Sequence, residues 1–273
     1  MINSDPYRPY TAHRIMAHRM KRHLKKALRE FKYFSPLPSG AKYFALLAQE
    51  RTGSTLFSDL LSFHPKILMD RHHFYTTETW PDGYQSGHRI FSRKPVRGYK
   101  CKVTHTPRQS SPEEARSRLL ALSDHVSIIR LKRENKLRQA LSAINAQTPL
   151  HKWKDTGGGP EETDKAVIDV DRFIESISYY DVLTQFEDEA LTSVPHYTVL
   201  YEEDLLPQDQ HAQTANEAFQ FLGLKPAPVE TRLKKISKPN PYDDIANFDE
   251  LCDAIADTPY SKYLADIQLS PDQ

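Results

Sequence analysis

The chain has 273 residues, of which 38% are hydrophobic and 27% are charged, and its formal net charge at pH 7 is +1. This length suits one α/β domain or two small ones, and the balanced charge excludes the overall basic signature of a nucleic-acid-binding protein. Two cysteines, Cys101 and Cys252, exclude a disulfide scaffold and offer no zinc-site spacing. Without a signal peptide or an apolar run of about 18 residues, we expect a cytoplasmic protein with no metal and no membrane span.

Residues 1–42 differ in composition from the rest of the chain. Between Arg8 and Lys32 there are nine lysine or arginine residues and a single acidic one, Glu30. Apolar residues recur there at helical spacing, which predicts a basic amphipathic helix. We therefore divide the chain into a basic N-terminal helical extension, 1–42, and a single domain, 43–273. The helix is interpreted as an accessory element, or alternatively as a surface for an acidic substrate, partner or lipid.

From residue 43 onward, short apolar runs alternate with segments of helical periodicity. The pattern predicts strands at 43–48, 66–69, 96–103, 125–131 and 196–200. It predicts helices at 55–63, 112–123, 134–147, 170–191 and 210–222, followed by two short C-terminal helices. It predicts loops at 81–95, 156–160 and 225–241. Strands separated by helices indicate βαβ units, so the expected fold class is α/β, with a mainly parallel central sheet flanked by helices.

The segment after the first predicted strand reads Arg51-Thr52-Gly53-Ser54-Thr55 and then becomes helical. A turn between a strand and a helix presents the free N–H groups and the positive dipole end of that helix. Gly53 lets the backbone approach a ligand closely, Arg51 supplies a forked cation for oxyanions, and the three hydroxyl residues add donors. The segment therefore predicts a phosphate or sulfate site, with an ordinary helix cap as the alternative interpretation.

This segment is not a Walker A loop, because it holds one glycine and no lysine. Arg-Thr-Gly-Ser-Thr after a strand, followed by a helix that ends in His-Pro, instead resembles the sulfotransferase family. In that family the loop binds the 5′-phosphosulfate of 3′-phosphoadenosine 5′-phosphosulfate (PAPS). The resemblance implies a P-loop-like sulfotransferase fold, with PAPS as the sulfuryl donor. The residues that it assigns to donor binding in this loop are Arg51, Thr52, Gly53, Ser54 and Thr55.

A second block supports the resemblance. The family pattern is a strand, an arginine, an asparagine two residues later, a leucine, and a serine in the second turn of the next helix. Arg133, Asn135, Leu137 and Ser142 match it. The resemblance implies that Arg133 and Ser142 grip the 3′-phosphate of the nucleotide, at the sheet edge where α/β proteins bind ligands.

Two later blocks, 197–224 and 232–251, extend the resemblance to about residues 43–265 and make it closest to bacterial carbohydrate and nodulation-factor sulfotransferases. In the family, a basic residue of the second block closes over the nucleotide. Lys235 is the first choice for this role, with Lys234 and Lys238 as alternatives.

The chain departs from the family pattern where the catalytic base is expected. After His-Pro, bacterial members often carry Gly-Glu before a Leu/Ile-Phe pair, and that glutamate is a proposed base. Aligned on Phe74, His72 takes the glutamate position. A histidine suits a base at neutral pH, because its unperturbed pKa is about 6.5. His73, His105 and Asp70 remain alternatives.

The resemblance implies in-line sulfuryl transfer from PAPS to a hydroxyl or amine, with Arg51 stabilising charge on the leaving bridge oxygen. The implied acceptor is a carbohydrate or a small metabolite, contacted by loops 71–97 and 154–163. The alternative function is a P-loop-like nucleotide-binding or kinase-like protein without sulfotransfer. Preference for a 3′-phosphorylated nucleotide over ATP would separate the two. The sequence predicts no nucleic-acid partner and leaves the oligomeric state open.

Overall fold

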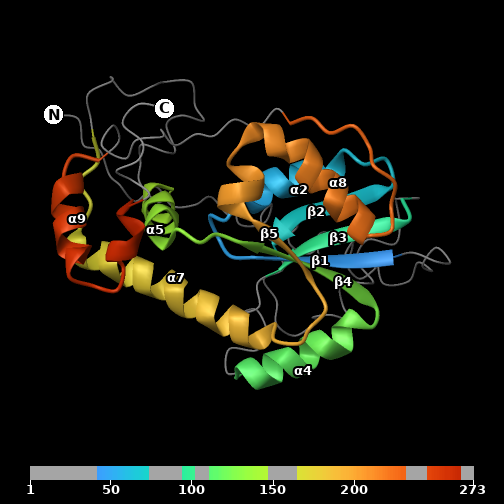
Figure 1. Ribbon diagram of the computed structural model, residues 1–273, viewed down its shortest axis with the longest axis horizontal. Coiled ribbons are helices and arrows are strands. Elements are labelled where there is room, and N and C mark those ends of the chain that lie inside the picture. The colour runs from blue at the N-terminus through green and yellow to red at the C-terminus, as the bar shows by residue number, and fades with distance from the viewer. Residues whose placement is uncertain (1–41, 74–93, 102–110, 147–164, 232–244, 266–273) are drawn as a thin grey trace, which may run out of the picture. The chain divides into compact units, whose positions relative to one another are not determined.

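The computed structural model describes residues 42–73, 94–101, 111–146, 165–231 and 245–265, with the side chains of 70–73 left out (Figure 1). Contacts divide the chain into two units, and every described residue belongs to the one made of 42–77 and 94–273. The predicted N-terminal helix and the loops 81–93 and 156–160 lie outside the described residues, so those predictions stay as they are.

Five strands form one sheet in which every pairing between neighbours is parallel. The spatial order is β2-β3-β1-β4-β5. The strands are β1 (Lys42–Ala48), β2 (Ile67–His73), β3 (Val96–Cys101), β4 (Val126–Lys132) and β5 (Tyr197–Leu200). Six of the seven residues of β1 are buried, as expected for a central parallel strand covered on both faces. The predicted α/β class with a mainly parallel sheet is confirmed.

Helices cover both faces of this sheet (Figure 1). On one face lie α2 (Ser54–Ser62) and α8 (His211–Phe221), and on the other lie α4 (Pro112–Ser123) and α7 (Val170–Ala190). Beyond the carboxyl edge of the strands, α5 (Lys136–Asn145) and α9 (Phe248–Ala256) pack against α7. A π-helical turn, Tyr201–Leu205, follows β5 directly, and 3-10 turns span Gln208–Gln210 and Ser261–Tyr263.

The helix boundaries follow from local chemistry. Ser111 caps α4 by accepting a hydrogen bond from the N–H of Glu114, and Asp169 caps α7 in the same way through Arg172. Helix α8 ends before Gly223, whose φ of 71° is the left-handed conformation that glycine adopts readily after a helix. These helices and the strands of the sheet were all predicted, to within a few residues, from periodicity and caps.

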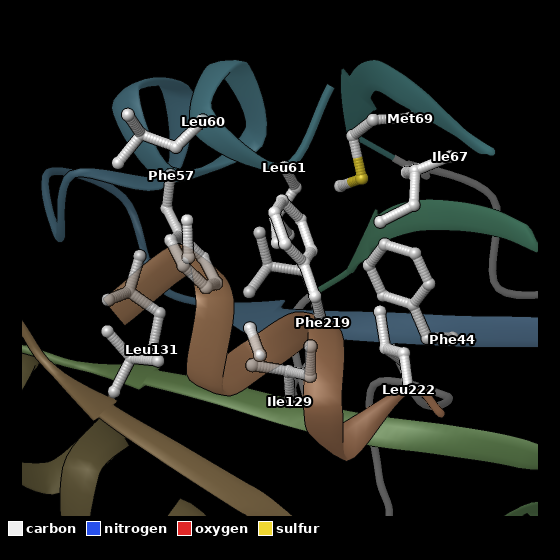
Figure 2. Packing of buried hydrophobic residues seen from close by; sticks show 14 of the residues in the cluster. Phe44, Phe57, Leu60, Leu61, Ile67, Met69, Ile129, Leu131, Phe219 and Leu222 are labelled. Carbon is white, nitrogen blue, oxygen red and sulfur yellow. The ribbon is translucent and has the colours of Figure 1, made fainter. Parts of the chain in front are cut away.

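Two hydrophobic clusters of the described part of the chain flank the candidate site. In the first, side chains of α2 and α8 pack on β1, β2 and β4, as Figure 2 shows for Phe57, Phe219, Phe44, Met69 and Ile129. The second joins α5, α7 and α9, and includes Leu137, Phe173 and Phe248. Loops at the carboxyl ends of β1, β4 and β5 lie where elements of the two clusters meet.

The strand order creates a topological switch point. From β1 the chain crosses to β2 on one side, and from β3 it passes β1 to reach β4 on the other side. The connections that follow the adjacent strands β1 and β4 therefore leave in opposite directions. Ligands of open α/β sheets bind at such a crevice, outside the carboxyl ends of the strands.

Candidate functional site: an anion loop at the switch point

The segment Gln49–Gly53, called here the anion loop, joins β1 to α2 at the switch point. Its backbone turns through two left-handed residues, Arg51 with φ 63° and Gly53 with φ 83°. The left-handed conformation is uncommon for a residue other than glycine and is concentrated at functional sites. Gly53 is the N-cap of α2 and gives this helix no side-chain cap. The first N–H groups of α2 thus carry the partial positive charge of an uncapped helix start.

Gly53 is required for packing as well as for conformation. A Cβ at this position would lie 2.7 Å from Cδ2 and 2.8 Å from Cε2 of Tyr201. The other neighbour of the Tyr201 ring is the guanidinium of Arg133, whose Cζ lies 4.6 Å from the ring centroid. Tyr201 therefore contacts both Gly53 of the anion loop and Arg133, in a cation–π arrangement with the latter.

The two sequence blocks assigned to nucleotide binding meet in the structure. Arg51 Nε donates a hydrogen bond to Ser142 Oγ on α5 at 2.9 Å. Arg133, which follows β4, donates from its NH1 group to the carbonyl oxygen of Arg51 at 2.8 Å. Both ends of Arg51, side chain and backbone, are thus held by residues of the second block.

The hydroxyl residues of the loop differ in their surroundings. Thr52 is buried, and its Oγ1 donates to the carbonyl oxygen of Gln49 at 2.8 Å. The hydroxyl hydrogen of Thr52 is therefore already used in a hydrogen bond within the loop. The donor that remains for a ligand at this residue is its backbone N–H. Ser54 is buried and Thr55 is exposed, so of the two, Thr55 presents its hydroxyl to solvent.

The start of α5 contrasts with the start of α2. Asn135 caps α5 by accepting from the N–H of Arg138 at 2.8 Å. Glu202 accepts from the N–H groups of Glu134 and Asn135, at 3.0 and 3.1 Å, and its carboxylate lies 3.7 Å from Arg133 Nε. A carboxylate thus lies beside the start of α5, next to its N-cap, whereas the start of α2 has no side-chain cap.

A buried group of charged side chains lies behind the loop. Arg130 contacts Glu187 at 3.7 Å and Asp188 at 2.6 Å. Lys136 donates to the carbonyl oxygen of Arg133. Burial raises the pKa of Glu187 to about 7, against the opposing attraction of Arg130, and burial lowers the pKa of Lys136 to about 8. Burial also lowers the pKa of Arg133, although arginine stays charged at neutral pH.

The structure describes less of the residues predicted as the catalytic base and of the lysine predicted to close over the nucleotide. His72 and His73 end strand β2, whose pairing with β3 shifts register between Asp70 and His73. The carboxyl end of β2 lies at the same sheet edge as the anion loop, since the strands are parallel. The remaining predicted site residues, His105 and Lys235, lie outside the described residues, as do the acceptor loops apart from a few positions at their ends.

Sequence reasoning missed several residues of this site. Tyr201 and Glu202 contact Arg133, and they directly follow β5, so the rule that parallel strands end at one edge could have indicated them. Tyr180 of α7 was also missed. Burial raises its pKa to about 12, with a further contribution from the negative charge of Glu50 and an opposing one from Arg51.

No family model matches the sequence, and a search of curated proteins finds no match either. Among solved structures, the chain is similar to the crystal structure of a sulfotransferase from Alicyclobacillus acidocaldarius, with 13% sequence identity and a TM-score of 0.48. The match covers 85% of this chain and 95% of that one. What this chain does is therefore inferred below from the residues of its own site.

Two further properties bear on the class of protein. Among the helices of the described residues, none is long and apolar enough to cross a membrane. Within the same residues, no group of three or more His, Cys, Asp or Glu side chains is arranged to hold a metal ion.

Proposed function

We propose that the protein is a sulfotransferase that moves a sulfuryl group from PAPS to a hydroxyl or amine of a carbohydrate or small-molecule acceptor. The observation that carries the proposal is the contact between Arg51 and Ser142 at the uncapped start of α2. It joins the residue proposed for the 5′-phosphosulfate to a residue proposed for the 3′-phosphate. A nucleoside with anionic groups at both positions is the ligand that such a pair suits.

The donor set of the anion loop fits this nucleotide. It combines the guanidinium of Arg51, the hydroxyls of Ser142 and Thr55 and the uncapped N–H groups of α2, all of which can donate to oxyanions. Arg133 lies next to this set, where its charge adds to the positive potential. The nearby carboxylate of Glu202 is engaged by the start of α5. When bound, PAPS would supply an activated sulfuryl group and a good leaving phosphate.

Each residue has a role in the proposed reaction. Arg51 and the N–H groups at the start of α2 stabilise the negative charge that grows on the bridging oxygen as the sulfuryl group leaves. Ser142 and Arg133 bind the 3′-phosphate. His72 accepts the proton of the attacking hydroxyl or amine, with His73 and His105 as alternatives, and Lys235 closes over the nucleotide. No metal ion takes part in this scheme.

Nucleotide binding tests this proposal directly. Calorimetry should show that adenosine 3′,5′-bisphosphate binds about ten- to hundred-fold more tightly than 5′-AMP, because charge-assisted hydrogen bonds contribute roughly 1.5–3 kcal/mol each. Ser142→Ala should reduce this preference, and its effect on the affinity for 5′-AMP, which arises from the lost hydrogen bond to Arg51, should be smaller than its effect on adenosine 3′,5′-bisphosphate. Ser117→Ala is the matched control, since Ser117 Oγ donates only within its own helix, to Glu113 O.

The alternative function is a P-loop-like nucleotide-binding or kinase-like protein without sulfotransfer. It predicts that ATP binds at least as tightly as adenosine 3′,5′-bisphosphate, and that result would reject the sulfotransferase. Turnover is measured with a sulfur-labelled donor against a panel of sugars and small hydroxylated or aminated compounds. Transfer of label to a member of the panel identifies the acceptor class.

A further inference from the structure

Three consecutive carbonyl groups of the anion loop each accept a hydrogen bond from a different side chain. Thr52 Oγ1 donates to Gln49 O, Gln139 Nε2 donates to Glu50 O, and Arg133 NH1 donates to Arg51 O. Each of these donor–acceptor distances is 2.8 Å. The donors come from the loop itself, from α5 and from the end of β4, so the loop is fixed from three directions.

These bonds also set the direction of the N–H groups. In a trans peptide the carbonyl and the following N–H point in opposite directions. Each side chain that holds a carbonyl therefore turns the next N–H, that of Glu50, Arg51 or Thr52, away from itself. Successive N–H groups presented in this manner beside a helix start form a concave anion-binding nest.

Among the three donors, Gln139 has no other assigned role. Its side chain is fully buried, and besides Glu50 O it contacts Gln49 Oε1 at 3.3 Å. Gln49 in turn donates to Thr184 Oγ1 at 3.3 Å, and Thr184 donates to Tyr180 O. A chain of polar contacts thus extends from α7 through Gln139 to the loop backbone, across 89 residues of sequence between Gln139 and Glu50.

We propose that Gln139 is a positioning residue for the anion loop. By holding Glu50 O it keeps the N–H of Arg51 turned toward the anion, although Gln139 itself is buried beneath the loop. A ligand then meets a preorganised set of donors and does not have to order the loop on binding. The inference rests on the proposed function in taking that anion to be the 5′-phosphosulfate of the donor.

Inorganic pyrophosphate is the probe, because it tests the loop without a nucleoside. We expect Gln139→Met, which keeps the volume but removes the donated hydrogen, to weaken pyrophosphate binding about ten-fold in calorimetry. Asn247→Leu is the matched control. Asn247 also fixes backbone with its amide, donating to Ile168 O and accepting from Ile168 N, but away from the loop. The control should bind pyrophosphate within about two-fold of wild type at a comparable loss of melting temperature.

A second pair of variants covers the case in which Gln139→Met does not fold. Gln139→Glu keeps the shape and, while ionised, cannot donate to Glu50 O, and Asn247→Asp introduces the same charge elsewhere. Only the Gln139 variant should lose pyrophosphate affinity. Adenosine 3′,5′-bisphosphate and 3′-AMP differ only in the 5′-phosphate. In nucleotide titrations, the factor by which the bisphosphate binds more tightly than 3′-AMP should therefore be smaller for the Gln139 variants than for wild type.

The two proposals fail in different ways. If Gln139→Met and Gln139→Glu bind pyrophosphate as tightly as wild type, the positioning role is overturned, whatever the nucleotide preference of the protein. It is also overturned if the wild type binds no pyrophosphate. If pyrophosphate binding depends on Gln139 while wild type does not prefer the 3′-phosphorylated nucleotide, the positioning role stands and the sulfotransferase proposal does not.

Discussion

At the scale of single residues, Arg51 concentrates the features expected of a group that acts in the transition state. Its backbone has a φ of 63°, which costs energy in a residue with a side chain. Two contacts compensate, from Arg133 to its carbonyl oxygen and from its own Nε to Ser142. The hydrogen bond to Ser142 holds the guanidinium in place, so in its proposed role it would need little reorganisation as charge develops.

Arg51→Ala should therefore lower turnover more than it lowers affinity for adenosine 3′,5′-bisphosphate. Loss of one preorganised donor of this kind costs on the order of a hundred-fold in rate. Steady-state kinetics and calorimetry on the same preparation separate the two effects. Arg116→Ala is the matched control, because Arg116 donates to Glu189 O at the far end of α7. Unchanged turnover in Arg51→Ala would assign the charge-stabilising role to another residue.

The histidines at the end of β2 supply a second residue-scale prediction. His72→Ala should lower turnover by about 10²–10⁴-fold, the usual contribution of a general base, and leave nucleotide affinity intact. His72→Glu should restore part of the rate, since a carboxylate can accept the same proton. The measurement is turnover at saturating donor with any accepted acceptor.

His73→Ala and His105→Ala serve as comparisons for the same measurement. Where a strand is regular, successive residues alternate between its two faces, so only one of His72 and His73 would face the donor. Because the register of β2 shifts between Asp70 and His73, the three variants are compared directly. Near-normal turnover in His72→Ala together with loss in His73→Ala or His105→Ala would move the base to that residue. It would leave the nucleotide site unchanged.

At the scale of elements, the π-helical turn after β5 packs against the anion loop through the aromatic ring of Tyr201. Tyr201 contacts Arg133, and a Cβ at Gly53 would meet its ring at 2.7 Å. Leu205 of the same turn would lie 3.5 Å from that Cβ. The loop between β1 and α2 is therefore packed against an element that is 148 residues further along the chain, counted from Gly53 to Tyr201 (201 − 53).

Gly53→Ala should destabilise the fold by more than its backbone conformation alone explains. A left-handed alanine costs roughly 1–2 kcal/mol, and displacing Tyr201 adds to this. Gly223→Ala is the matched control, since its φ of 71° is similar but its Cβ would meet only the flexible end of Lys42 at 3.1 Å. Chemical denaturation gives both free energies of unfolding. Equal losses in the two variants would contradict a packing role for Gly53.

The elements of the sheet were predictable, and many contacts of the site were not. Periodicity and caps found β1, α4 and α7 because a buried strand and an amphipathic helix leave a local pattern. Arg51, Arg133 and Ser142 were assigned to nucleotide binding through the family resemblance, and that role stays a prediction; what the structure adds is that the three residues contact one another. The contact of Gln139 with the loop could not be predicted. In the sequence Gln139 is one of several polar residues of α5, and its hydrogen-bond partner, Glu50 O, lies on a different element. Contacts between distant elements depend on packing, which a local pattern does not encode.

At the scale of the whole molecule, the buried charges beneath the site couple stability to pH. Burial raises the pKa of Glu187 to about 7 from its usual value of 4.5. Between these two values the unfolded chain has released the proton while the folded chain still holds it. Folding stability contributed by this group is therefore full below about pH 4.5 and falls as the pH rises to about 7.

Glu187→Gln should remove this dependence. The free energy of unfolding of the variant minus that of wild type should increase as the pH rises from about 4.5 to 7, because only wild type loses stability across this window. Removing the carboxylate also deprives Arg130 of one partner, which lowers stability by an amount that does not vary across this window. The measurement is denaturation of both proteins at several pH values. A difference that is flat, or that changes in the opposite direction, would contradict the raised pKa.

The contacts that fix the anion loop join parts of the chain that are made at very different times during synthesis. Arg51 meets Ser142 across 91 residues and Gln49 meets Thr184 across 135, and Tyr201 packs on Gly53 from further still. A nascent chain cannot assemble this site before residues 201 and 202 have left the ribosome. The proposed nucleotide would consequently stabilise only chains that extend past β5, and fragments released earlier would gain nothing from it. In a cell supplied with the nucleotide, that difference would help proteases separate complete molecules from truncated ones.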